Sequence, residues 1–296
     1  MKQRDLAEYV ILALVWGLSF MVLVRVVAAF GWAGTVSLRA LTAGISLLAL
    51  ALILRRPINL RTGWRPLAVS GLLTVGGQLT GIAFAAPLIG TAMTAIIVST
   101  IPLFSMVVGR LAGLERLSAQ SMIGLVMGFG GIVLLVGFPA APMTPMFLLG
   151  CAVSIAGSFS AACGSLYVST KLKGVDPWVV TIGSFLCGGV ITLPLLLAVP
   201  VPAMPTAMDL FWLLVLGLVT SALMYVLYFR LLAAIGATRA ISVEFAVTVV
   251  AVLAGTTVLG EQLSAIQFAG AAVIIAGCAM VLGIGAPKRN QAISKT

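Results

Sequence analysis

Residues Gly90 to Gly137 read GTAMTAIIVSTIPLFSMVVGRLAGLERLSAQSMIGLVMGFGGIVLLVG. After a shift of 146 residues, Gly236 to Gly283 read GATRAISVEFAVTVVAVLAGTTVLGEQLSAIQFAGAAVIIAGCAMVLG. The two stretches align over 48 positions without a gap, and nine positions are identical, including the run Glu-x-Leu-Ser-Ala. Chance likeness of two apolar segments explains shared glycines, but not two shared polar residues in a chain with seven acidic ones. We interpret the match as an internal duplication.

The composition is that of a membrane protein made of helices. The chain is 61% apolar and 8% charged, whereas soluble domains carry about 25% charged residues. The apolar runs continue for about 20 residues without alternating, which excludes a membrane β-barrel. The chain has no His and no paired Cys motif, so we expect no metal and no cofactor. Its net charge of +10 is spread between apolar runs, which argues against nucleic acid as a partner.

Ten apolar runs are long enough to span a bilayer. They cover residues 7–30, 34–54, 66–86, 88–112, 118–137, 147–170, 177–199, 209–234, 238–259 and 264–285. Apart from Arg25 and Arg39, all Lys and Arg residues lie at the two termini and in the even-numbered connections. Because basic residues stay on the cytoplasmic side, this pattern predicts that both termini are cytoplasmic.

An odd number of helices in each half gives the two halves opposite orientations. The sequence therefore predicts an all-α polytopic membrane protein with ten transmembrane helices as a 5+5 inverted repeat, the architecture of secondary transporters. The first repeat covers residues 1–140, the second covers 141–285, and 286–296 form a cytoplasmic tail. Small residues on the fifth and tenth helices suit close packing within one protomer or in a homodimer, so the oligomeric state stays open.

The polar junctions that recur in the two halves have a structural explanation. Ser118 and Ser264 stand where the fifth and tenth helices begin, and each can cap its helix. Gln267 completes a capping box with Ser264. Glu115 and Glu261 precede the same helix starts, where negative charge is favourable, so we interpret them as helix-end residues.

Several residues and one short motif resemble those of a known protein family. Trp16-Gly17, Arg39, Pro102 and the Glu-Arg-Leu-Ser run that begins at Glu115 look like those of the EamA-type drug/metabolite transporters. The resemblance covers essentially the whole chain and is most like the YddG-type exporters of aromatic and other neutral amino acids. One departure is Thr248, which stands where the family often has a second proline.

The resemblance implies a multi-pass exporter of small organic metabolites in the bacterial inner membrane. Aromatic and neutral amino acids are the best-fitting substrates, and a central cavity between the halves would open alternately to each side. The fifth and tenth helices would lie at the periphery. Alternatives are another metabolite or drug as substrate, or a passive channel. No acid–base pair, nucleophile or metal constellation supports an enzyme, and no phosphate-binding loop supports a pump driven by ATP.

Polar and aromatic residues in the middle of a span should face a cavity or another helix. The candidates for the substrate pathway are Trp16, Ser19, Gln78, Thr80, Ser99, Pro102, Tyr225 and Tyr228, together with Glu244. Packing alone is the alternative role for each of them. Pro102 should disturb the fourth helix. Arg25 and Arg39 lie near outer helix ends, and we expect them to extend toward the outer surface, or to attract a carboxylate from an outer vestibule.

Glu244 is the only acidic residue deep within a predicted span, and its duplicate position is Val98. A charge at this depth is costly, so the carboxyl should be paired, protonated or exposed to an aqueous cavity. Pairing with Arg230 is the structural alternative. The functional alternatives are binding of a substrate ammonium group and proton coupling.

The predicted orientation of the second half can be tested at the Glu261 connection. We expect a cysteine introduced by Gln262→Cys to react with a membrane-impermeant thiol reagent on intact cells, because that connection is predicted to lie outside. A residue in a cytoplasmic connection, changed by Gly174→Cys, should react only after the cells are opened. Absence of labelling at position 262 in well-inserted protein would contradict the inverted orientation.

Overall fold

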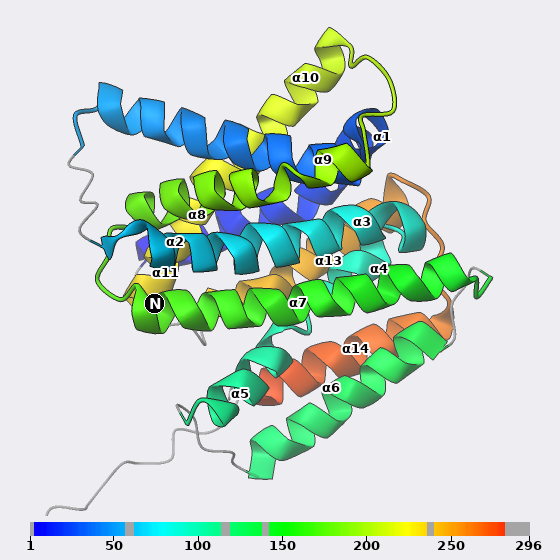
Figure 1. The fold of residues 1–296 in the computed structure, drawn as a ribbon. Coiled ribbons are helices and arrows are strands. Elements are labelled where there is room, and N and C mark those ends of the chain that lie inside the picture. Colours follow the sequence, from blue (N-terminus) through cyan, green and yellow to red (C-terminus); the bar gives the residue numbers. More distant parts are fainter. Residues whose placement is uncertain (1–2, 57–61, 114–118, 138–141, 236–239, 282–296) are drawn as a thin grey trace, which may run out of the picture.

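The computed structural model describes residues 3–56, 62–113, 119–137, 142–235 and 240–281. All regular elements in these ranges are helices, as predicted, and no strand occurs among them (Figure 1). In chain order they are α1 (Gln3–Ile53), α2 (Trp64–Gly71), η2 (Leu72–Leu79), α3 (Thr80–Ile89), α4 (Thr91–Val98), α5 (Ile101–Leu111), α6 (Ala119–Gly137), α7 (Pro145–Lys171), α8 (Pro177–Thr192), α9 (Leu195–Ala198), α10 (Ala207–Leu214), η3 (Val215–Leu223), α11 (Met224–Ile235), α13 (Val243–Thr257) and α14 (Ala265–Val281).

Six helical stretches are long and apolar enough to cross a membrane by length and composition. They are Gln3–Ile53, Trp64–Ile89, Thr91–Leu111, Pro145–Lys171, Pro177–Ala198 and Ala207–Ile235. Three shorter apolar helices accompany them within the described ranges, at Met122–Gly137, Val243–Thr257 and Ala265–Met280. The chain therefore has the helices of a polytopic membrane protein.

Helix α1 combines the first two predicted spans. An unbroken helix of its 51 residues would be roughly 77 Å long, far more than the roughly 30 Å of a bilayer core. The backbone of Gly31 is not helical, with φ 69° and ψ 165°, a conformation that a side chain would disfavour. The two parts of α1 on either side of Gly31 run in different directions (Figure 1).

Two helices contain a π-helical segment at mid-length. Segment η2 interrupts the stretch Trp64–Ile89, and η3 interrupts the stretch Ala207–Ile235. At the end of η3, the amide of Met224 donates to Ser221 and Val219, which leaves the carbonyl of Thr220 free of that amide. At the end of η2, the amide of Thr80 skips one carbonyl in the same way. Such irregular turns are found at functional sites.

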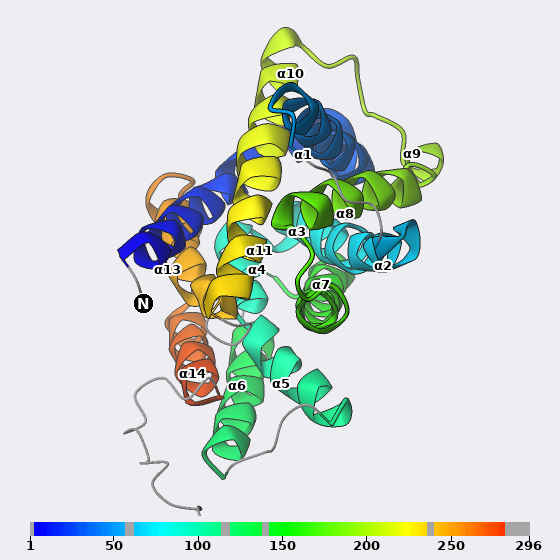
Figure 2. The same ribbon diagram turned by 90° about the vertical axis from the view of Figure 1, so that its left-hand side faces the viewer.

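Helices α6 and α14 pack against each other at one edge of the bundle, as the resemblance implies for the fifth and tenth helices (Figures 1 and 2). Their contact depends on missing side chains. A Cβ on Gly131 would lie 2.8 Å from the carbonyl oxygen of Gly270, and one on Gly277 would lie 2.6 Å from that of Gly124. Only glycine allows the two backbones to approach this closely.

The predicted capping box of α14 is confirmed. The Ser264 amide donates to Gln267 Oε1 at 2.9 Å, and the Gln267 amide donates to Ser264 Oγ at 3.1 Å. Ser118 and Glu115, the corresponding residues of the first half, lie outside the described residues. Glu261 is a helix-end residue, as predicted, but the helix is not the one that follows it in the sequence.

Glu261 caps α4 instead of the helix that follows it. Its carboxylate accepts hydrogen bonds from the amide and hydroxyl of Thr91, at 2.7 and 2.8 Å, and from the amide of Ala92 at 2.8 Å. The first amides of a helix have no partner in their own helix, and a carboxylate also suits the positive end of its dipole. A residue of the second half thus satisfies the start of a helix in the first half.

The close contact of α6 with α14 can be tested by adding one methyl group. We expect Gly277→Ala to lower the free energy of unfolding by about 1–3 kcal/mol, because the new Cβ would overlap backbone atoms of α6. Gly130→Ala is the matched control, since nothing lies within 4 Å of its Cβ position and alanine favours a helix. Thermal unfolding of both variants in detergent measures the difference; equal stabilities would contradict the contact.

Candidate functional site

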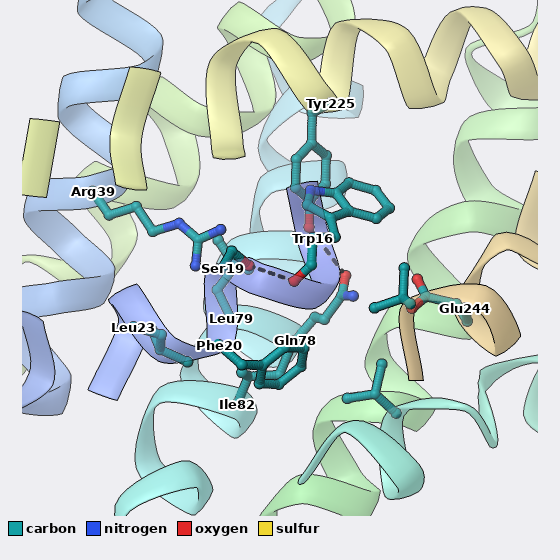
Figure 3. Close-up of a pocket in the computed structure, with 12 residues that line it drawn as sticks. Trp16, Ser19, Phe20, Leu23, Arg39, Gln78, Leu79, Ile82, Tyr225 and Glu244 are labelled. Atoms are coloured by element: carbon teal, nitrogen blue, oxygen red, sulfur yellow. Dashed lines mark hydrogen bonds between the residues drawn. The ribbon is translucent and has the colours of Figure 1, made fainter. Parts of the chain in front are cut away.

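A central cavity lies where both parts of α1 meet η2, α3, α4, α11 and α13. Its volume is about 40 Å³. The lining residues are Trp16, Ser19, Phe20, Leu23, Arg39, Gln78, Leu79, Ile82, Val98, Tyr225, Glu244 and Val247 (Figure 3). Five of the residues predicted from the sequence are therefore brought together here, and they come from four different predicted spans.

Trp16 forms the aromatic wall of this cavity. Its indole N–H donates to the carbonyl of Thr220 at 2.9 Å, the carbonyl that the Met224 amide skips. Its ring packs against Tyr225 and Tyr228, with centroids 5.2 and 5.4 Å away. The irregular turn of η3 thus fixes the orientation of Trp16, because an indole donor buried away from water needs an acceptor.

Gln78 lies between the central cavity and a smaller one beside it. Its Oε1 accepts a long hydrogen bond of 3.5 Å from the Tyr225 hydroxyl. The smaller cavity is lined by Trp16, Gln78, Tyr225 and Glu244 again, and by Tyr228 and Ser165. The hydroxyls of Tyr228 and Ser165 lie 3.1 Å apart and share a hydrogen bond. Tyr228 therefore lines the adjoining cavity and not the central one.

Arg39 does not reach outward as predicted. Only 6% of its surface is exposed, and its guanidinium points into the cavity (Figure 3). Arg39 Nε donates to Ser221 Oγ at 2.5 Å, and Nη2 donates to Thr220 Oγ1 at 3.3 Å. Arg25, by contrast, is exposed and lies over the ring of Trp212, 5.4 Å from its centroid.

Glu244 is 7% exposed and lines both cavities. Its carboxylate has no ion pair within the described ranges. The structural alternative of a pair with Arg230 is not found, since Arg230 Nη2 lies 2.5 Å from Glu8 Oε1 on α1. Arg239, the other basic residue considered, lies outside the described residues. The Glu244 carboxylate and the Arg39 guanidinium thus line the same cavity from opposite sides (Figure 3).

The other predicted residues lie away from the cavities or bond to their own helix. Ser19 lines the central cavity, and its hydroxyl donates to the carbonyl of Trp16 at 2.7 Å. Thr80 donates to Val75 O of its own helix at 3.4 Å, and the buried Ser99 donates to Ile96 O at 2.7 Å. Pro102 stands in the first turn of α5, just after the interruption between α4 and α5, which agrees with the disturbance predicted there.

Two contacts hold the N-terminal end of α1 against the rest of the bundle. Glu8 joins α1 to α11 through Arg230, and Arg4 lies 3.3 Å from the same Glu8 oxygen. The Tyr9 hydroxyl donates to the carbonyl of Ser242 at 2.7 Å. Glu8 and Tyr9 lie about two helical turns from Trp16 along α1, so bonded side chains separate the cavity from that end.

The sequence analysis missed the inward direction of Arg39. It also missed Thr220 and Ser221, which hold the Arg39 guanidinium. A polar pair within the apolar run 209–234 was a usable signal. The shift of 146 residues also relates Thr220 to Thr74, which lines the smaller cavity. Among the described residues, no group of three or more His, Cys, Asp or Glu side chains is placed to hold a metal ion.

Comparisons with known proteins agree with this architecture. The profile of the EamA-like transporter family matches residues 8–137 and again residues 148–283. Protein PecM of Dickeya dadantii is 29% identical over 99% of this chain and 96% of its own length. The uncharacterized inner membrane transporter YedA of Escherichia coli is 28% identical over 91% of this chain and 88% of its own. A solved crystal structure has the same fold, with a TM-score of 0.68 at 18% identity over 95% of this chain and 96% of that one.

Proposed function

Because this chain belongs to the EamA-like transporter family, we propose that it is a secondary transporter that exports small organic metabolites through the central cavity. The observation that carries this proposal is the cavity itself. It lies deep within an apolar helical bundle, yet it is lined by Arg39, Gln78 and Glu244. Ionisable groups at such depth are costly, and in membrane proteins they mark the paths of ions and substrates.

The proposal includes ten spans in two inverted repeats, residues 1–140 and 141–285, with 286–296 as a cytoplasmic tail. The two parts of α1 count as two spans, and eight further apolar helical stretches follow in the described ranges. The two separate matches of the family profile, one in each half, support the duplication. So does the presence of one π-helical segment in the third predicted span of each half.

Packing contacts support the same symmetry. A shift of 146 residues turns Gly131 into Gly277 and Gly124 into Gly270, and this exchange converts each of the two close α6–α14 contacts into the other. A second pair behaves alike. The Cβ position of Gly71 lies 2.7 Å from the amide nitrogen of Gly188, and that of Gly217 lies 2.9 Å from Thr42 Cγ2.

The second pair extends the repeat beyond the aligned stretch. Gly71 and Gly217 differ by 146, as do Thr42 and Gly188. Contacts that are preserved when the two halves are exchanged are those expected of a two-fold axis between them. Such inverted repeats alternate access to a site at their interface.

We place the protein in the bacterial inner membrane with both termini in the cytoplasm. The distribution of Lys and Arg between the predicted spans supports this orientation, and the relative YedA is named an inner membrane transporter. Aromatic and other neutral amino acids are the substrates we favour. The support is chemical: Trp16 and Tyr225 offer aromatic faces, and Arg39 and Glu244 offer opposite charges to a zwitterion.

Transport can be tested by counterflow in liposomes that contain only this protein. We expect saturable exchange of labelled L-phenylalanine that unlabelled L-phenylalanine competes for. Trp16→Ala and Gln78→Ala should reduce the exchange at least tenfold while the amount of folded protein stays near that of the wild type, since both side chains line the cavity. Leu6→Ala is the matched control at an exposed position of the same helix as Trp16.

The outcomes of this experiment separate the candidate functions. Flux that does not saturate would indicate a channel. Exchange of other small metabolites but not of amino acids would contradict only the substrate assignment. If exchange and protein abundance fall together in the two variants, the residues serve packing alone.

A second experiment addresses Glu244. We expect Glu244→Gln, which keeps the shape and removes the charge, to abolish exchange or its dependence on a pH gradient, because the carboxylate faces the cavity without an ion pair among the described residues. Exchange that persists at normal abundance with an unchanged pH dependence would rule out both ammonium binding and proton coupling.

A further inference from the structure

Arg39 presents a positive charge to the cavity that no side chain neutralises in the described part of the protein. The ion pairs there join Glu8 to Arg4 and Arg230, and no carboxylate lies within 4.0 Å of the Arg39 guanidinium. An arginine remains protonated in proteins. A buried cation without a counter-charge is costly, so an arginine in this position at the wall of a cavity indicates a function for its charge.

The guanidinium is held in place by neutral groups. The hydroxyls of Thr220 and Ser221 donate their own hydrogens to the carbonyl of Leu216, at 2.6 and 3.0 Å, so their lone pairs are available to accept from Arg39. These hydroxyls orient Arg39 without cancelling its charge. The same turn of η3 also holds Trp16 through the Thr220 carbonyl, so one irregular turn positions both side chains.

Some N–H groups of the Arg39 guanidinium remain available to donate hydrogen bonds to a ligand. A guanidinium has five N–H donors in a planar fork, and the two hydroxyls account for one donor on each of two nitrogens. Figure 3 shows the guanidinium directed toward Ser19 and Trp16, across the cavity from Glu244. This planar fork matches the geometry of a carboxylate, which it can bind with two parallel hydrogen bonds.

We propose that Arg39 binds the carboxylate of the transported molecule, and that the substrates are therefore organic carboxylates. The proposal rests on the transport function proposed above and adds the group by which the substrate is recognised. The aromatic faces of Trp16 and Tyr225 lie beside the carboxylate position and suit an apolar or aromatic remainder.

The test compares ligands that differ only in the carboxylate. Purified protein in lipid nanodiscs is titrated with 3-phenylpropionate and its amide, and with L-phenylalanine and L-phenylalaninamide, and binding is followed by calorimetry. We expect each carboxylate to bind at least tenfold more tightly than its amide. 3-Phenylpropionate lacks the ammonium group, so the first pair isolates the contribution of Arg39 from that of Glu244.

Variants assign the preference to Arg39. Arg39→Gln should remove the preference for the carboxylate, and Arg39→Lys should retain part of it, because lysine keeps the charge but loses the fork. Arg25→Gln is the matched control at an exposed arginine of the same helix and should retain the full preference. The wild-type comparison of acid with amide remains decisive even where a variant folds poorly.

Each contrary result overturns the proposal. Equal binding of acids and amides would exclude carboxylate recognition, and so would binding of neither. A preference that survives Arg39→Gln would place the anion elsewhere, and one that is also lost in Arg25→Gln would indicate a general charge effect. The transport function itself is judged separately, by the counterflow experiment in liposomes.

Discussion

Every polar group inside the bilayer core must find its partner within the protein, because the lipid offers none. The π-helical turn of η3 interrupts the regular backbone hydrogen bonds of its helix, and side chains from α1 supply partners there. At its end the Met224 amide skips the carbonyl of Thr220, and the indole N–H of Trp16 donates to that carbonyl. In the same turn, the hydroxyls of Thr220 and Ser221 both donate to the Leu216 carbonyl, so their oxygens can accept hydrogen bonds from Arg39. The chemistry of the cavity therefore depends on one irregular turn in a helix that the sequence presents only as an apolar run.

Properties that arise within one segment could be read from the sequence. Hydropathy located the apolar helices, the Ser264–Gln267 capping box follows from a spacing of three, and the interruption before α5 follows from Pro102. Trp16, Gln78 and Glu244 stood out because they are polar or amphipathic in the middle of apolar spans. Their common cavity is what that reasoning anticipates, since lipid would leave each of them unsatisfied.

Properties that arise between distant segments could not be read in this way. Arg230 binds Glu8, more than 200 positions away, and not Glu244 on a neighbouring predicted helix. Glu261 caps α4 and not the helix that follows it. Arg39 turns inward because Thr220 and Ser221 approach it, and that approach depends on Gly217 lying against Arg39 and Thr42. Charge and depth define what a residue needs, but only the fold defines which of several partners is near.

The Glu261 cap has a mechanical consequence for any movement of the protein. The amide of Glu261 donates to the carbonyl of Gly255 at 3.0 Å, and Thr248 on α13 donates to the carbonyl of Ala95 on α4 at 2.9 Å. Helices α4 and α13 are thus linked at two levels, so separating them would strand several buried donors at once. Each half of the sequence contributes one helix to this hydrogen-bonded pair, so a movement that keeps these bonds intact must carry α4 and α13 together.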